Sequence, residues 1–165
     1  MIKITDNFLD TDTFNTLSNE LLMPSFPWYA SSIDAKDHEG NALRNMQLVH
    51  YFYENNVAMD GCQMLFPVMQ KIDPLAVLRI KANLTLQHDT QLKHDLHIDI
   101  TNASNPFLMT SILYMNTNNG YTMFEDGTKI DSVANRMLFF DASKLHNSST
   151  TSDAPGRFNI NLNFR

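Results

Sequence analysis

Arg157-Phe158-Asn159-Ile160-Asn161-Leu162-Asn163-Phe164 alternates polar and apolar residues without interruption. Successive side chains of a β-strand point to opposite faces, so one face carries an arginine and three asparagines and the other is aromatic and aliphatic. The apolar face must pack against something, and we expect helices to cover it. The polar face either meets solvent or lines a polar cavity inside a closed β-structure.

Similar patterns mark most of the second half of the chain as β-structure. Residues 75–87 alternate between an apolar face and a polar face that contains Arg79, Lys81, Asn83, Thr85 and Gln87. Further strands are expected near residues 96–100, 108–116, 121–124, 129–133, 137–141 and 157–164. Many short strands indicate a closed barrel, a sandwich or a double-sheet jelly roll, and periodicity alone does not choose among these.

Two helices are expected in the first half. Residues 10–12 offer N-cap side chains, and Phe14, Leu17 and Leu21 then recur at helical spacing until Pro24 and Pro27 end the helix. A second helix is expected over residues 57–72, closed by the Asp-Pro pair at 73–74; its apolar stripe contains Cys62, Leu65, Phe66, Met69 and Ile72.

Residues 28–53, between these helices, look irregular, with turn signals at Asp37, Gly40 and Asn41. No linker or internal repeat divides the chain. We therefore expect a single α+β domain over residues 1–165. The sequence does not fix its oligomeric state.

Composition narrows the class of protein. The formal net charge is −6, from 12 Lys and Arg against 18 Asp and Glu, and no basic run occurs. We therefore do not expect a nucleic acid as partner, although the overall composition does not reveal a small local patch of basic residues. The single cysteine, Cys62, excludes an intrachain disulfide and favours a reducing, cytoplasmic setting. We expect no signal peptide and no membrane span.

His97-Ile98-Asp99 is the first candidate for chemistry. It is the only His-x-Asp/Glu tripeptide among six histidines, but six histidines and 18 acidic residues in 165 give about 0.65 such tripeptides by chance. Its context gives it weight, because on a strand residues i and i+2 share a face, so the imidazole and the carboxylate can reach one ion. His94 precedes His97 by an odd spacing and is left out of the ligand set.

His146 is the candidate third ligand, shortly before the final strand. Two histidines and one carboxylate on one face of an ion leave open positions, as in the facial triad of non-haem Fe(II) oxygenases. Such a site suits Fe(II), although Mn, Co, Ni or Zn would also bind. The alternative is that His97 and Asp99 form a surface hydrogen-bonded pair and His146 is a loop histidine.

Arg157 and Tyr114 are candidates for holding an anionic ligand. Arg157 follows His146 by eleven residues, and its planar guanidinium fits a carboxylate in a bidentate way. Tyr114 lies in an apolar strand where a phenol needs a partner. The alternatives are a salt bridge from Arg157 to an acid such as Asp153, and a core position for Tyr114.

Together these segments resemble the prolyl-4-hydroxylase-like branch of the 2-oxoglutarate/Fe(II) oxygenases, particularly compact phage-encoded members. The resemblance covers roughly residues 75–165, and it is carried by His97-x-Asp99, Tyr114-x-Asn116, Gly120-x-Thr122-x-Phe124, His146 and Arg157. It implies a double-stranded β-helix (jelly roll) with supporting N-terminal helices. It also implies a cytoplasmic location, in the host cell if the protein is phage-encoded.

The resemblance also implies a reaction and a set of binding residues. His97, Asp99 and His146 are implied as iron ligands, with Arg157 and Tyr114 at the distal carboxylate of 2-oxoglutarate. Asn83 is a further candidate for touching the co-substrate, as is Lys81, although surface exposure is the alternative for both. The implied reaction uses Fe(II), 2-oxoglutarate and O₂, releases succinate and CO₂, and hydroxylates a C–H bond. Because Asp99 is retained, the resemblance implies hydroxylation rather than halogenation.

The chain departs from the family pattern beside the Thr-x-Phe motif. Asn119-Gly120 stands where a Gly-Gly pair is common, and Tyr121 stands where an acidic residue is frequent. This bears on substrate preference, which we expect to be set by residues 28–53 and 102–106. A peptidyl proline, a small molecule and a nucleobase stay open as substrates. A jelly-roll module that binds metal or ligand without turnover is the alternative to an enzyme.

Overall fold

The computed structural model describes residues 1–33, 46–100 and 107–165. The predicted turn at Asp37, Gly40 and Asn41, and the predicted specificity loop at residues 102–106, lie outside the described residues.

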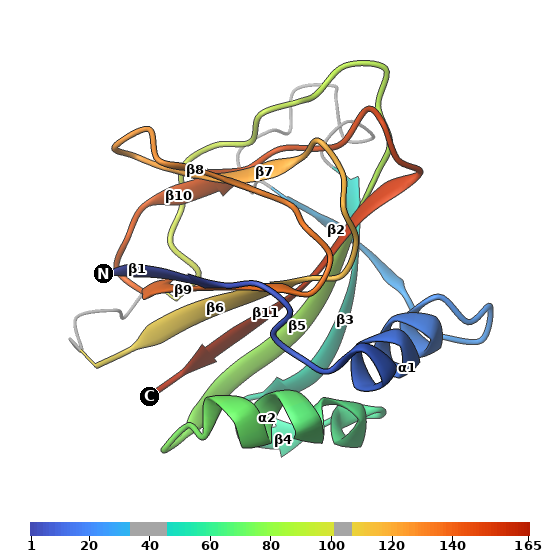
Figure 1. Ribbon diagram of the computed structural model, residues 1–165, viewed down its shortest axis with the longest axis vertical. Coiled ribbons are helices and arrows are strands. Elements are labelled where there is room, and N and C mark those ends of the chain that lie inside the picture. Colours follow the sequence, from blue (N-terminus) through green and yellow to red (C-terminus); the bar gives the residue numbers. More distant parts are fainter. Residues whose placement is uncertain (34–45, 101–106) are drawn as a thin grey trace.

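Two antiparallel sheets face each other, and the helices lie on the far side of the larger sheet (Figure 1). The large sheet runs in the order β1-β9-β6-β11-β5-β3-β2, with β4 paired to β3, and the small sheet in the order β10-β7-β8. The strands of the large sheet are β1 (Ile2–Thr5), β2 (Tyr29–Ser32), β3 (Met46–Glu54), β4 (Val57–Ala58), β5 (Val77–Leu86), β6 (Met109–Tyr114), β9 (Arg136–Asp141) and β11 (Gly156–Phe164). Those of the small sheet are β7 (Tyr121–Phe124), β8 (Lys129–Asp131) and β10 (His146–Ser148).

Strand β11 confirms the prediction drawn from its alternating sequence. It pairs with β5 on one side and with β6 on the other, so it is a central strand. Phe158, Ile160 and Leu162 pack in the main core between the large sheet and the helices. Arg157 and Asn159 are buried on the opposite face, which lines a polar cavity. The solvent-facing alternative for this face is therefore wrong.

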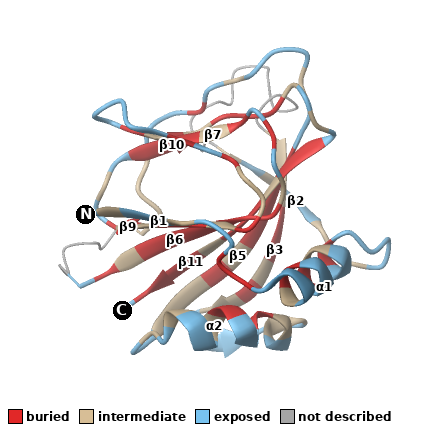
Figure 2. Ribbon diagram, in the orientation of Figure 1, coloured by how far each residue is buried: buried red, intermediate tan, exposed pale blue. Residues whose placement is uncertain are grey.

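The first predicted helix is confirmed as α1 (Thr11–Leu21). Its N-cap is Asp10, whose carboxylate accepts a hydrogen bond of 3.0 Å from the Thr13 N–H. Phe14, Leu17 and Leu21 are buried against the sheet, as the helical spacing indicated. Burial therefore follows one face of this helix (Figure 2).

The predicted helix over residues 57–72 is wrong in its first half. Asn55 and Asn56 have φ of 53° and 62°, which reverses the chain into the short hairpin β3–β4. A 3₁₀ turn (Cys62–Leu65) follows, and the α-helix α2 spans only Phe66–Ile72. Asp73, in the left-handed region at φ 52°, ends the helix at the predicted position.

Three further predictions about strands need correction. In the described part of residues 28–53, β2 and most of β3 lie where irregular structure is predicted. The alternation of β3 is hidden because a register shift between Tyr51 and Tyr53 interrupts it. Residues 96–100 form no regular strand and are joined to β10 only by an isolated bridge between His97 and His146. Strands β1 and β10 were not predicted, because four and three residues carry too little pattern.

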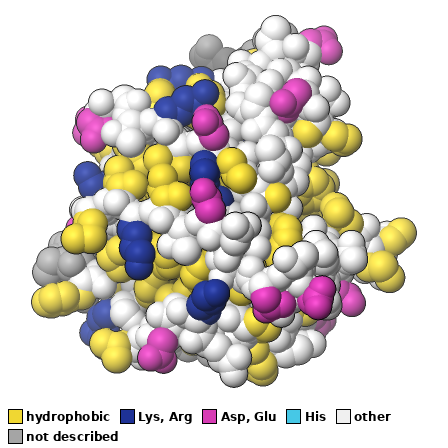
Figure 3. Space-filling model, in the orientation of Figure 1, with side chains coloured by type: hydrophobic (Ala, Val, Ile, Leu, Met, Phe, Trp, Pro, Cys, Tyr) yellow, Lys and Arg dark blue, Asp and Glu magenta, His cyan; other side chains and the backbone are white. Residues whose placement is uncertain are grey.

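Figure 3 shows one face of the molecule, on which dark blue basic side chains lie among magenta acidic ones rather than in a continuous stripe. No helix in the described part of the chain is long and apolar enough to cross a membrane.

Candidate metal centre

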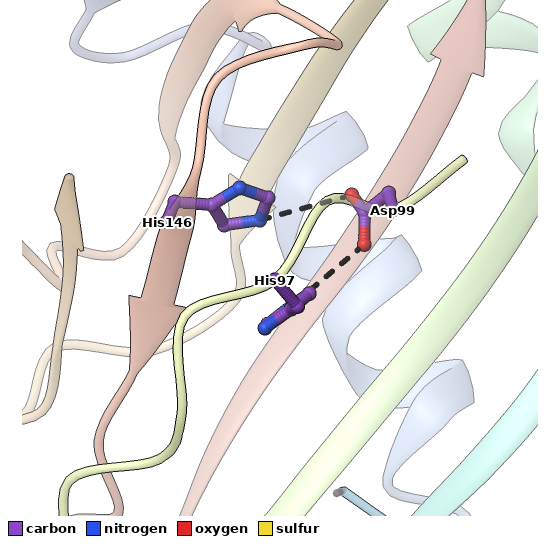
Figure 4. Close-up of side chains that lie close together, drawn as sticks. All are labelled: His97, Asp99 and His146. Carbon is purple, nitrogen blue, oxygen red and sulfur yellow. Dashed lines mark ion pairs between the residues drawn. The ribbon is translucent and has the colours of Figure 1, made fainter. Parts of the chain in front are cut away.

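His97, Asp99 and His146 come together at one wall of the cavity, although Asp99 and His146 are 47 positions apart in the chain (146 − 99). His97 and His146 exchange backbone hydrogen bonds of 2.9 and 3.0 Å, which places them directly opposite each other. Asp99 follows two residues later on the same side. One ligand atom from each residue lies within 4.8 Å of the others. The three side chains converge on a common space (Figure 4).

Both imidazoles are held in the orientation that a metal requires. The Nδ1 atom of His97 lies 3.2 Å from the Asp95 carbonyl, and that of His146 lies 3.0 Å from the Lys144 carbonyl. A carbonyl only accepts, so each Nδ1 carries a hydrogen, and in the neutral imidazole Nε2 is then the nitrogen with a free lone pair. These Nε2 atoms lie 3.9 Å from the two oxygens of Asp99. Such contacts to the second ring nitrogen are typical of metal-binding histidines.

Burial favours the neutral, metal-binding form of His146, and it leaves one oxygen of Asp99 without a hydrogen-bond donor among the described residues. Desolvation lowers the pKa of His146, which keeps its imidazole neutral. The Asp99 side chain is only 7% exposed, and its Oδ2 accepts no hydrogen bond from the described residues. Arg79 lies 3.4 Å from the other carboxylate oxygen. A buried carboxylate oxygen without a donor fits a place for a cation.

The polar cavity beside this triad has a volume of about 400 Å³. Its floor is the polar face of β5 and β11, including Lys81, Asn83, Thr85, Arg157, Asn159 and Asn161. Its opposite wall comes from the small sheet and the segment that carries His97 and Asp99. The cavity therefore lies between the two sheets, with the triad on one side.

Arg157 is a fully buried cation of this cavity. Its Nε donates to the Ser132 hydroxyl at 2.8 Å, and its Nη2 donates to the Thr122 hydroxyl at 3.1 Å. No Asp or Glu of the described residues forms an ion pair with it, so the predicted alternative of a bridge to Asp153 is wrong. Desolvation lowers the pKa of Arg157, although an arginine stays charged. Among the described residues, the hydrogen bonds and the ring contact of this buried charge are to neutral groups, which fits an anionic ligand.

Tyr114 and Asn83 lie at different depths. Tyr114 is fully buried, its hydroxyl donates to Thr122 at 2.8 Å, and its ring lies 5.5 Å from the Arg157 guanidinium carbon. Tyr114 thus supports Arg157 and Thr122 and does not line the cavity. Asn83 does line it, and its amide donates to Asn159 at 2.9 Å.

Thr122, Ser132 and Arg79 were not singled out from the sequence as site residues. Thr122 carried a signal, because it lies in the Gly-x-Thr-x-Phe segment and alternates with apolar neighbours. Arg79 shares the polar face of β5 with Asn83. No sequence pattern indicates a functional role for Ser132, since serine is common after a short strand.

Gly120, in the segment that departs from the family pattern, touches the Arg157 side chain. A Cβ atom added here would lie 2.6 Å from Cδ of Arg157 and 2.7 Å from the side-chain oxygen of Asn118. The glycine retained at this position is therefore required by the close approach of Arg157.

His94 stays outside the ligand group, as its spacing indicated. It is buried, its Nδ1 lies 2.8 Å from the Ser148 hydroxyl, and its backbone N–H donates to the Ser148 carbonyl. Burial lowers its pKa to about 4.

Sequence comparison finds no family model and no curated protein that matches the chain. Solved structures do match. A prolyl hydroxylase of Trichoplax adhaerens, in complex with a hypoxia inducible factor peptide fragment, is 16% identical with a TM-score of 0.70, covering 99% of this chain and 82% of that one. The non-haem alpha ketoglutarate dependent epimerase SnoN from nogalamycin biosynthesis is 12% identical with a TM-score of 0.70, covering 99% and 77%.

The viral collagen prolyl hydroxylase of Paramecium Bursaria Chlorella virus-1, as its 2-oxoglutarate complex, is 15% identical with a TM-score of 0.62, covering 99% and 94%. At these identities the likeness establishes the fold. It confirms the predicted α+β class with a jelly-roll (double-stranded β-helix) core, a fold that this chain shares with solved 2-oxoglutarate/Fe(II) oxygenases.

Proposed function

We propose that this protein is an Fe(II)- and 2-oxoglutarate-dependent dioxygenase that hydroxylates a C–H bond. The observation that supports it best is the pairing of two features in one cavity. The triad of His97, Asp99 and His146 offers a metal site with open positions, and the buried Arg157 offers a site for a carboxylate. Residues 1–165 are proposed to form one domain with this activity.

The donor set fits Fe(II). Two neutral imidazoles and one carboxylate are ligands of suitable hardness, and they leave several coordination positions for a co-substrate and O₂. His97 and His146 would bind through Nε2, because each Nδ1 hydrogen is directed at a carbonyl. Asp99 would bind through an oxygen of its buried carboxylate.

Arg157 fits the distal carboxylate of 2-oxoglutarate. The guanidinium is held in place by Ser132 and Thr122, and Thr122 also accepts from Tyr114, so the cation is oriented before a ligand arrives. Asn83, fixed by Asn159, is proposed to contact the co-substrate from the floor. When bound, Fe(II) and 2-oxoglutarate supply the oxidising chemistry, with O₂ consumed and succinate and CO₂ released. The protein orients these groups and shields them from water.

The primary substrate is a peptide or a small molecule in this proposal. A prolyl group is one candidate, since two of the three similar structures described above are prolyl hydroxylases. The cytoplasmic, phage-encoded setting stays a prediction of the sequence.

An anaerobic titration tests the proposal. Fe(II) is added to the metal-free protein, 2-oxoglutarate follows, and the charge-transfer absorbance of the chelate is recorded. Oxygen is then admitted and succinate is measured. We expect the band and succinate in the wild type, and neither in His146→Ala or Asp99→Ala. Metal binding without either signal would instead indicate a non-catalytic binding module.

A mass-spectrometric search for a gain of about 16 Da among prolyl peptides and free amino acids would then identify the substrate.

A further inference from the structure

Lys81 is a positively charged side chain of the cavity that has no role in the proposed binding of Fe(II) and 2-oxoglutarate. It lies on β5, half-buried, on the face that also carries Asn83 and Thr85. No carboxylate of the described residues forms an ion pair with its ammonium group. Its neighbour is the Tyr51 ring, whose centroid lies 5.8 Å from Nζ. Burial lowers the pKa of Lys81, and the attraction of Asp99 and Glu54 offsets only part of this effect. An anion bound beside the ammonium group would therefore stabilise its charge.

The position of Lys81 separates it from the proposed 2-oxoglutarate anchor. In the β5–β11 register Arg157 lies opposite Thr85, and Lys81 lies opposite Asn161. Lys81 and Thr85 are four positions apart on β5, which is about 13 Å along the strand. The hydrogen-bonded pair of Asn83 and Asn159 lies between the two rows. Arg157 and Lys81 therefore belong to different parts of the floor.

Charge balance among the described residues that line the loaded cavity leaves Lys81 without a matching negative charge. The two positive charges of Fe(II) equal the two negative charges of 2-oxoglutarate. Arg79 lies against Asp99 and offsets its charge. Among the described residues that line the cavity, Arg157 and Lys81 then remain, against the carboxylate of Asp95. Glu54 also attracts Lys81, but it does not line the cavity. A loaded site with excess positive charge favours a negatively charged substrate.

We propose that Lys81 binds the carboxylate of the primary substrate, so that the enzyme acts on a small carboxylic acid, with free amino acids as the first class to test. The inference rests on the proposed function, because both carboxylates of 2-oxoglutarate are assigned there, one to the metal and one to Arg157. A cavity of about 400 Å³ that also holds 2-oxoglutarate has room for a small acid.

The experiment compares matched acids and amides. Each free L-amino acid and its carboxamide is added to the anaerobic Fe(II)–2-oxoglutarate protein, and the change in the charge-transfer band gives a dissociation constant. We expect at least one acid to bind and its amide to bind about 10- to 100-fold more weakly. Lys81→Met should weaken binding of that acid by a similar factor, and Lys81→Arg should retain most of it.

Lys71→Met is the matched control, because Lys71 also lies over an aromatic ring, that of Phe8, but on α2 outside the cavity. It should leave acid binding unchanged. Equal binding of acids and amides, no binding by any acid, or unchanged acid binding in Lys81→Met would overturn the inference. In each of these cases, the proposed function still holds if Lys81→Met binds 2-oxoglutarate as the wild type does. The proposed function itself would be refuted if the wild type showed no charge-transfer band with Fe(II) and 2-oxoglutarate.

Discussion

Arg157 is the residue at which the proposed co-substrate site is most sharply defined. Removing one partner of a desolvated charge pair costs roughly 2–5 kcal/mol, which is on the order of 30- to several-thousand-fold in affinity. We expect Arg157→Ala to raise the dissociation constant for 2-oxoglutarate within that range and to leave Fe(II) affinity nearly unchanged. Arg157→Lys should recover only part, since a point charge does not reproduce the guanidinium fork.

Tyr114→Phe provides a graded comparison for that experiment. It removes a neutral donor to Thr122, one hydrogen bond away from Arg157, so the loss should be about 1 kcal/mol. The readout for all three variants is the anaerobic charge-transfer titration. An unchanged 2-oxoglutarate affinity in Arg157→Ala would mean that the co-substrate is anchored elsewhere.

His94 leads to a second prediction at the residue scale, which concerns how the free energy of unfolding depends on pH. Its pKa is lowered from 6.5 to about 4 by burial, so between these values the unfolded chain binds more protons than the folded one. The free energy of unfolding should therefore fall as pH decreases from 6.5 toward 4, by on the order of 2 kcal/mol over the first unit and a half.

Urea unfolding at pH 7 and pH 5 measures this effect, with His94→Gln as the comparison. The variant should lose much of the difference between the two pH values, because glutamine does not titrate. His146 also has a lowered pKa and contributes with the same sign, so a residual slope is expected. A variant with the full wild-type slope would show that His94 is not the group that titrates.

At the scale of elements, the turn before β7 is fitted to Arg157 through Gly120. A Cβ here would lie 2.6 Å from the Arg157 Cδ, so Gly120→Ala must displace the arginine or the turn. We expect a loss of about 1–3 kcal/mol in stability and weaker 2-oxoglutarate binding. Differential scanning fluorimetry and the charge-transfer titration measure the two effects.

Gly127→Ala is the control for that prediction. Gly127 has φ of +85° and nothing within 4 Å of its position for Cβ, so the substitution strains the backbone without touching the cavity. It should lower the melting temperature and leave 2-oxoglutarate affinity unchanged. If both variants leave that affinity unchanged, the contact between Gly120 and Arg157 has no part in co-substrate binding.

At the scale of the whole molecule, the proposed metal joins parts that are distant in the sequence. His97 and Asp99 follow β5, and His146 begins β10, so an ion bound by all three would link these segments. A ligand that binds only the folded state at 100 times its dissociation constant adds about 2.7 kcal/mol, which corresponds to roughly 5–10 °C in melting temperature.

Fe(II) added under anaerobic conditions should therefore raise the melting temperature of the wild type, and EDTA should reverse the rise. Asp99→Ala should show no such rise. His88→Ala, which removes a histidine outside the triad, should respond as the wild type does. A full rise in Asp99→Ala would place the stabilising ion at another site.

The sequence by itself determined the elements with strong patterns. The alternation of β11 and β5, the N-cap and apolar spacing of α1, and the turn at Asp73 are local properties, because each depends on residues close in the chain. The pair His97 and Asp99 was also indicated locally, by the spacing of two residues, although the structure has an isolated bridge at His97 and a bend at Asp99 in place of the expected strand. The helix predicted over residues 57–72 failed locally as well, since the left-handed Asn55 and Asn56 outweighed an apolar stripe.

Only the tertiary structure decided which distant residues meet. The bridge between His97 and His146 depends on pairing across a gap of 49 residues (146 − 97), and no local pattern encodes that register. The roles of Tyr114 and Lys81 were decided in the same way. The Tyr114 hydroxyl donates a hydrogen bond to Thr122. Lys81 faces the cavity and forms no ion pair with a carboxylate of the described residues. The sequence determines the chemical type of each side chain. The packing of the two sheets decides its partners, because it brings together residues that are far apart in the chain.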